Sequence, residues 1–146
     1  MTEADDAGGQ DLLAHALLPV ANEDDALATA RALEPYETGR VTALHVVEKG
    51  EGVPDKTPVE QSEELAAESY AAVRTVFPDA DEHTAYDRDV VEAIFEAAGV
   101  VGASAIAYRP RGGNRLVQLL SGDLATELVT DAPVPVVALP RAEADE

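Results

Sequence analysis

Val41-Thr-Ala-Leu-His-Val-Val47 decides the fold, because it is an uncharged run rich in β-branched residues. Such a run is typical of a strand that is covered on both faces. A helical pattern capped by Asn22 precedes it, and the acidic residues of its first turn oppose the positive end of the helix dipole. Another helical pattern follows, opened by Thr57, Pro58 and Glu60 as a capping box. A strand between two helices predicts a parallel sheet built from crossover units.

The same alternation of strand and helix extends toward both ends of the chain. Further strands are predicted at 15–20, 81–86, 103–108 and 135–139, and further helices at 89–98, with Gly99 as a stop, and at 122–130. This order predicts one α/β domain over residues 11–140, a five-stranded, parallel, doubly wound and Rossmann-like sheet, with flexible tails at 1–10 and 141–146. Ligands of such sheets bind beyond the carboxyl ends of the strands, here near Ala21 and Arg109.

The composition limits the classes of function. The 146 residues include 29 Asp and Glu against 10 Lys and Arg, for a formal net charge of −19, and they include no Cys. Disulfides and thiolate chemistry are therefore excluded, and nucleic acid or an anionic membrane is a poor partner for so acidic a surface. Because the acidic residues are spread over every segment, we expect adaptation to molar salt, as in a halophile. The N-terminal sequence has no signal-peptide pattern, which predicts a cytoplasmic protein.

The stretch Arg109-Pro-Arg-Gly-Gly-Asn-Arg-Leu-Val-Gln-Leu-Leu-Ser-Gly-Asp123 carries the strongest functional signal. It is basic and rich in glycine, and it joins a predicted strand to a predicted helix. Loops of this kind hold phosphate with backbone N–H groups and the N-terminus of the following helix. Arg109, Arg111 and Arg115 either form an anion site or offset neighbouring carboxylates at the surface. The chain has neither a Walker A loop nor a G-x-G-x-x-G fingerprint.

Five short motifs occur in order along the chain. They are Leu17-Leu-Pro-Val20, Leu44-His-Val-Val47, Glu92-Ala-Ile94, Arg111-Gly-Gly113 ahead of Leu119-Leu-Ser-Gly122, and Ala132-Pro-Val-Pro-Val-Val-Ala-Leu139. In this set and order the chain resembles the universal stress protein family from Leu17 to Leu139. The resemblance implies the strand order 3-2-1-4-5. It also implies a homodimer formed through the strand Pro135–Leu139, and an edge strand of this kind does favour pairing.

Nucleotide-binding members of that family carry Gly-x2-Gly-x9-Gly-Ser/Thr around the phosphates. Gly112 and Gly122 match its second and third glycines, whereas Arg109 and Asp123 stand at its first and last positions. The acidic residue that those members carry after the first strand is here Ala21. A carboxylate at position 123 would occupy the helix N-terminal N–H groups and repel a triphosphate. The candidate nucleotide or phosphate region comprises Val46, Arg109, Arg111, Gly112, Gly113, Arg115, Gly122 and Asp123.

Two functions are compatible with this altered motif. The favoured one is a dimeric regulatory or stress-response domain with no enzymatic activity, no cofactor and no robust binding of ATP. The alternative is a switch that binds ATP or AMP and has weak ATPase activity, with Mg²⁺ bridging Asp123 to phosphate. His15, His45 and His83 lie on or near three different strands, so we expect structural histidines and no metal site. No serine has a G-x-S-x-G setting, so a hydrolase is unsupported.

Overall fold

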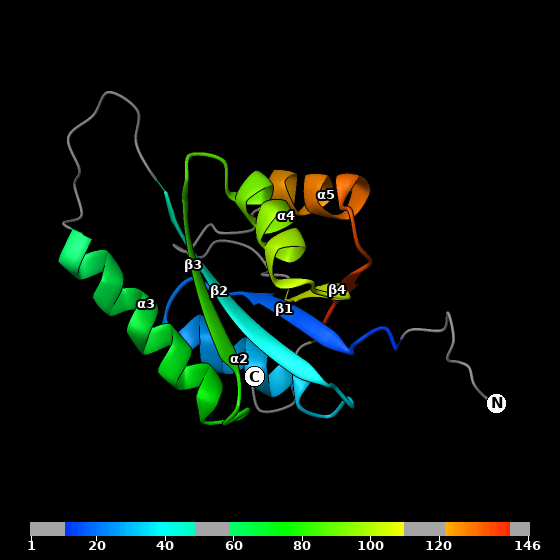
Figure 1. Ribbon diagram of the computed structural model, residues 1–146, viewed down its shortest axis with the longest axis horizontal. Coiled ribbons are helices and arrows are strands. Elements are labelled where there is room, and N and C mark those ends of the chain that lie inside the picture. The colour runs from blue at the N-terminus through cyan, green and yellow to red at the C-terminus, as the bar shows by residue number, and fades with distance from the viewer. Residues whose placement is uncertain (1–10, 49–58, 110–121, 141–146) are drawn as a thin grey trace.

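A computed structural model describes residues 11–48, 59–109 and 122–140 of the chain. Its strands and helices alternate as predicted (Figure 1). They are β1 (His15–Pro19), α2 (Glu23–Leu33), β2 (Arg40–Glu48), α3 (Val59–Arg74), β3 (Asp81–Asp87), α4 (Val90–Val101), β4 (Ala105–Tyr108), α5 (Gly122–Asp131) and β5 (Val136–Ala138). The expected tails at 1–10 and 141–146, and the capping residues Thr57 and Pro58, lie outside the described residues.

The five strands form one parallel sheet in the order β3-β2-β1-β4-β5, which confirms the predicted fold class and strand order. The central strand β1 pairs with β2 over its whole length and with β4 at Leu17–Ile106. From β1 the chain moves outward through β2 to β3, and it then crosses to β4 and β5 on the other side. The switch point in strand order therefore lies between β1 and β4, where ligands bind in sheets of this kind.

Helices cover both faces of the sheet, with α2 and α3 on one face and α4 and α5 on the other (Figure 1). The side chains of successive strand residues alternate between these two layers. Leu18 and Ala43 pack in the layer of α2 and α3, whereas Leu17 and Leu44 pack in the layer of α4 and α5. All four are at most 1% exposed, and burial of each leucine contributes about 1.5–3 kcal/mol. The two layers thus hold β1, and with it the switch point, in a fixed position.

Two of the predicted helix starts are confirmed in detail. The Asn22 side chain accepts a hydrogen bond from the Asp25 N–H at 2.8 Å, and Asp89 accepts one from the Glu92 N–H at 3.1 Å. Both are N-cap contacts that satisfy an otherwise unpaired backbone donor.

The prediction that Gly99 ends its helix is wrong. α4 continues to Val101, and Gly102 ends it at φ 74°, in the left-handed region that favours glycine. The carbonyl of Ala98 accepts hydrogen bonds from both Gly102 N–H and Ala103 N–H, at 3.1 and 2.9 Å. The sequence offers two glycines three residues apart, and only the positive φ identifies which one terminates the helix.

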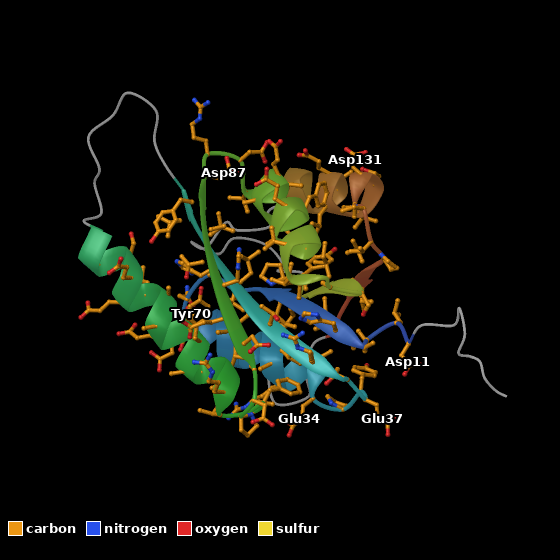
Figure 2. All side chains as sticks on the ribbon, in the orientation of Figure 1. Asp11, Glu34, Glu37, Tyr70, Asp87 and Asp131 are labelled. Carbon is orange, nitrogen blue, oxygen red and sulfur yellow. The ribbon has the colours of Figure 1, made fainter. Side chains whose placement is uncertain are left out.

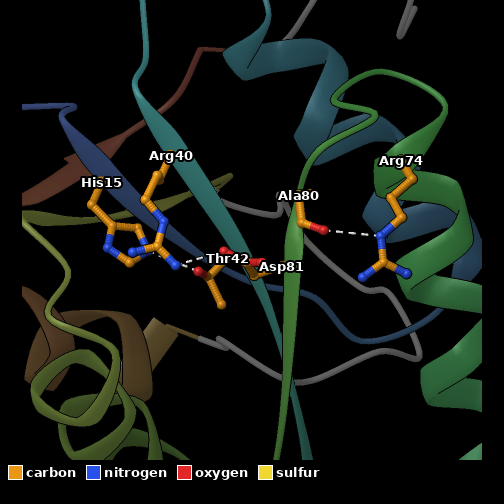
Figure 3. A network of polar contacts seen from close by, with 6 residues as sticks. All are labelled: His15, Arg40, Thr42, Arg74, Ala80 and Asp81. Carbon is orange, nitrogen blue, oxygen red and sulfur yellow. Dashed lines mark hydrogen bonds and ion pairs between the residues drawn. The ribbon is translucent and has the colours of Figure 1, made fainter.

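The amino ends of β1, β2 and β3 are joined by a polar network (Figure 3). His15 Nε2 lies 2.8 Å from Thr42 Oγ1, and Arg40 donates to Asp81 at 2.7 Å. On the far side of β3, Arg74 Nε donates to the Ala80 carbonyl at 2.9 Å. This network lies at the amino ends of the strands, opposite to the carboxyl ends that define the switch point.

Acidic side chains project outward from many parts of the molecule (Figure 2). The labelled carboxylates Asp11, Glu34, Glu37 and Asp131 are all exposed, and they come from segments far apart in the sequence. Within the ranges 11–48, 59–109 and 122–140, no three His, Cys, Asp or Glu residues come together as a group that could hold a metal ion. No helix in those ranges is long and apolar enough to cross a membrane.

Candidate functional site

The carboxyl ends of β1 and β4 lie side by side and define the candidate site. Their register pairs Ala16 with Ala105 and Leu17 with Ile106, and continuing it brings Val20 opposite Arg109. Val20 N–H donates to the Leu44 carbonyl at 2.9 Å, which holds the end of β1 against β2. The two positions expected beside a ligand, Ala21 and Arg109, therefore start from adjacent strand ends. Neighbouring strands are about 4.8 Å apart, so one small ligand could contact both.

A carboxylate of α2 accepts a hydrogen bond from the backbone just after the end of β1. Ala21 N–H donates to Asp25 Oδ2 at 2.7 Å, while Asp25 N–H donates to Asn22 Oδ1. Thr29 Oγ1 lies 3.5 Å from Asp25 Oδ1, one helical turn further along. Asp25 is only 6% exposed. The backbone donor at the switch point is thus already paired within the chain.

Residues near the end of β2 line both faces of the sheet. Val46 is 8% exposed and packs in the layer of α4, whereas His45 is 6% exposed and belongs to the layer of α2 and α3 by strand alternation. Burial lowers the pKa of His45 from its usual 6.5, and a hydrogen bond with the Val20 backbone opposes part of that shift. The imidazole is therefore neutral at pH 7. Its Nδ1 atom has no hydrogen-bond partner among the described residues.

A buried tyrosine of α3 holds β3, the strand next to β2. The Tyr70 hydroxyl donates to the His83 carbonyl at 2.7 Å and also contacts Thr84 Oγ1. Burial raises the pKa of Tyr70 to about 12, so the hydroxyl keeps its proton. Thr84 pairs in register with His45. Tyr70 (Figure 2) therefore links α3 to β3, the strand that pairs with β2 at His45.

On the β4 side of the site, the structure describes the two ends of the segment that joins β4 to α5. Arg109 follows β4 directly; it is half-buried, and its Nε atom is buried. The predicted contacts Arg111, Gly112, Gly113 and Arg115 lie outside the described residues. α5 begins at Gly122, so Asp123 belongs to its first turn by backbone position, as the sequence predicted. The structure thus brings Arg109 to the switch point and gives the Gly122–Asp123 helix start, while the loop between them stays a prediction.

One residue of this site was missed by sequence reasoning. Asp25 is one of the acidic residues of the first turn of α2, which the sequence analysis interpreted only as opposing the helix dipole. Its position three residues after the Asn22 N-cap is a capping-box spacing, which predicts that its side chain turns back toward the preceding backbone. That signal is present in the sequence, but it does not reveal that the carboxylate is buried beside the switch point.

Comparisons with known proteins agree with this fold. The model of the universal stress protein family matches residues 14–140. No curated protein sequence matches the chain at a significant level.

Three solved structures illustrate the similarity. The universal stress protein from Archaeoglobus fulgidus in complex with dAMP is 19% identical with a TM-score of 0.63, over 89% of this chain and 100% of that one. Universal stress protein UspA from Lactobacillus plantarum is 20% identical with a TM-score of 0.60, over 90% and 100%. A universal stress protein in complex with cAMP is 12% identical with a TM-score of 0.58, over 88% and 99%. At these identities the likeness is one of fold.

Proposed function

The chain belongs to the universal stress protein family, and we propose that it works as a dimeric, cytoplasmic regulatory domain of the stress response that does not bind ATP robustly. The observation that carries this proposal is the start of α5 at Gly122, which puts Asp123 in the first helical turn. The first turn of a helix that follows a glycine-rich loop is where phosphate binds when such a loop holds a nucleotide.

A carboxylate in that turn acts against a triphosphate in two ways. It competes for the same backbone N–H groups, and its charge repels the incoming anion. The other side of the switch point offers no compensation, because Ala21 N–H is already bonded to Asp25. The chain therefore has an acidic residue in the first turn of each helix that begins next to the site, Asp25 in α2 and Asp123 in α5. For the same reason we propose no catalytic role and no resident cofactor.

The proposed dimer uses β5. This strand lies at one end of the sheet order and pairs with β4 alone among the described strands. Val136 and Val137 are only half-buried, and Ala138 is exposed. An edge of this kind supports pairing with a second copy, while Pro135 and Pro140 at its two ends limit the pairing to this short segment.

A specific observation favours the alternative function, a nucleotide-dependent switch. Two proteins with this fold were solved in complex with dAMP and with cAMP, and this chain keeps the spacing between Gly112 and Gly122. Under this alternative the arginines and the Val46 backbone would hold ATP or AMP, and Mg²⁺ would link Asp123 to phosphate.

Ligand titration separates the two functions. The melting temperature and the heat of binding are measured in molar KCl with Mg-ATP, ADP and AMP, since a ligand that binds the folded state raises the melting temperature by mass action. We expect no shift with ATP below millimolar concentration. Micromolar affinity for ATP would refute the proposal and establish the alternative.

A variant tests the role assigned to position 123. Asp123→Ser should allow ATP to bind more tightly, because it removes the charge and restores a hydroxyl to the first turn of α5. Asp131→Ser, at the exposed last residue of the same helix, makes the same change in charge far from the site. If both variants alter ATP affinity equally, the effect belongs to net charge and position 123 has no special role.

A further inference from the structure

The sheet has a second edge strand, β3, which the proposed dimer does not use. Among the described strands β3 pairs with β2 alone, and its seven residues make it longer than β5, which has three. None of the residues of β3 is buried, whereas all five residues of β1 are. An edge strand presents a row of backbone N–H and C=O groups to a further strand, so β3 is the longer template for pairing.

β3 lacks the features that usually protect an edge strand. Its register with β2 runs without interruption along its whole length, so it contains no bulge. Its sequence, Asp-Glu-His-Thr-Ala-Tyr-Asp, has neither proline nor lysine, and the acidic residues stand at its two ends. β5, by contrast, is short and lies between Pro135 and Pro140. The centre of β3 is therefore the less protected of the two edges.

Contacts with α3 and β2 hold β3 in place. The Tyr70 hydroxyl of α3 donates to the His83 carbonyl at 2.7 Å, and that oxygen has a second lone pair for a further donor. Arg40 of β2 donates to Asp81 at 2.7 Å (Figure 3). A strand that is fixed in advance loses little conformational freedom when another strand pairs with it, which favours binding.

Charge decides which kind of strand fits this edge. Residues 79–89, which comprise β3 and the residues at its two ends, contain five Asp and Glu residues and a single Arg or Lys, Arg88. Arg40 and Arg74 pair with two of these acids, so the edge keeps a net negative charge. Antiparallel pairing with β3 of a second copy, centred on Thr84, would place acidic residues opposite each other at both ends, which is destabilising. A strand that carries Lys or Arg is the complementary partner.

Tyr86 adds a contact for the side chains of such a partner. It is 46% exposed, and strand alternation puts it on the same face as Thr84, which contacts Tyr70 of α3. An aromatic ring on an edge strand packs against a β-branched residue of the neighbouring strand and attracts a cation. β3 thus offers backbone groups, an aromatic ring and acidic ends to one extended segment.

We propose that the edge of β3 binds an extended, basic segment of a partner protein, which pairs with it as an additional strand. In this mode backbone hydrogen bonds supply affinity, and the side chains of alternate residues supply specificity. The inference goes beyond the proposed function and is independent of it, because β3 and β5 lie at opposite ends of the strand order. The competing interpretation is that the acidic ends only prevent pairing with other chains, in which case a basic peptide binds through net charge alone.

Three capped peptides separate the two interpretations. The probe, Lys-Val-Thr-Val-Thr-Val-Lys, matches the length of β3 and brings a cation to Asp87 in either direction of pairing. Lys-Val-Thr-Pro-Thr-Val-Lys has the same charge but interrupts the ladder of backbone hydrogen bonds. Glu-Val-Thr-Val-Thr-Val-Glu keeps the backbone and reverses the charge. Fluorescence anisotropy of labelled peptides gives the affinities for the full chain in molar KCl and at lower salt, and amide hydrogen exchange identifies the strand that becomes protected.

We expect the probe to bind and to slow amide exchange in β3, and the proline peptide to bind roughly tenfold more weakly at both salt concentrations. The glutamate peptide should also bind more weakly, by a factor that grows as the salt is lowered. Equal binding of the probe and the proline peptide would overturn the proposal, since charge alone would then explain it. Protection of β5 in place of β3, or no binding of the probe at millimolar concentration, would overturn it as well. None of these results bears on ATP binding, which the titration above tests separately.

Two variants test the side chains assigned to the partner. Tyr86→Thr and Asp87→Asn should each weaken binding of the probe by about threefold. Asn at position 87 keeps an oxygen for the Asp89 N–H, which Asp87 accepts at 3.2 Å. The matched control is Asp131→Asn, which makes the same change in charge at the exposed end of α5 and should leave the affinity unchanged. If Asp131→Asn weakens binding as much as Asp87→Asn does, net charge is the cause and the proposal fails.

Discussion

Replacing Gly99 by alanine should stabilise the domain, whereas the same replacement at Gly102 should destabilise it. Gly99 lies inside α4 and is exposed, and a Cβ added there meets no atom within 4 Å. Alanine is favoured over glycine by about 0.8–1.0 kcal/mol in a helix interior. The free energy of unfolding should therefore rise by up to about 1 kcal/mol in Gly99→Ala.

Gly102 provides the opposite case within the same helix. Its φ of 74° lies in the left-handed region, where a residue with a Cβ loses roughly 1–2 kcal/mol. No atom lies within 4 Å of the added Cβ at this position either. A loss of stability in Gly102→Ala would therefore come from the backbone conformation and not from a steric clash.

Urea denaturation followed by circular dichroism measures both variants against the wild-type chain. The two free energies of unfolding should differ by about 2–3 kcal/mol with opposite signs relative to wild type. In a thermal melt each kcal/mol corresponds to about 2–4 °C for a chain of this size. If Gly99→Ala is the more destabilising variant, the helix ends at Gly99 in solution and the assignment of Gly102 as its stop is wrong.

Three further predictions concern salt, pH and assembly. With a net charge of −19, the melting temperature should rise between dilute buffer and molar KCl as repulsion is screened, and an unchanged value would refute adaptation to salt. Burial lowers the pKa of His15 and His45 below 6.5, so the unfolded chain binds more protons just below that pH. Stability in molar KCl should therefore fall as the pH drops through about 6.5 toward the lower folded pKa values, and a urea midpoint that rises on acidification would contradict this. In β5, Leu139 N–H donates to the Tyr108 carbonyl of β4, so the N–H of the preceding Ala138 faces the free edge of the sheet. Light scattering should therefore give a dimer of twice 15.3 kDa for Ala138→Ser and a monomer of 15.3 kDa for Ala138→Pro, which lacks that N–H. A Pro variant that stays dimeric would exclude pairing through this edge.

The fold was predictable because its signals are local. Asn22 and Asp89 each cap the helix that the sequence assigned to them, since an N-cap depends on a contact only three residues away. The order of the strands came from the resemblance to a family, and the sheet confirms it. Gly99 was misassigned because the sequence does not show which of two nearby glycines adopts a positive φ.

The site was predictable only in its position. The order of strands and helices places the ligand beyond β1 and β4, but the environment of each side chain depends on contacts distant in sequence. His15 meets Thr42 across 27 residues, and Ser104 Oγ donates to the Leu12 carbonyl across 92. The burial of Asp25 likewise depends on how α2 lies against the sheet and α3, which no local pattern encodes.

Burial also decides which of the three acids at the start of α2 is least affected by concentrated salt. Carboxylates in the first turn of a helix contribute about 0.3–1 kcal/mol to the helix when exposed, and salt weakens both this gain and their repulsion of anions. Glu23 and Asp24 are exposed and fall in this class, whereas Asp25 is screened far less because it is buried. In molar salt the contacts of Asp25 with Ala21 N–H and Thr29 Oγ1 should therefore persist, whereas the contributions of Glu23 and Asp24 to the helix should weaken.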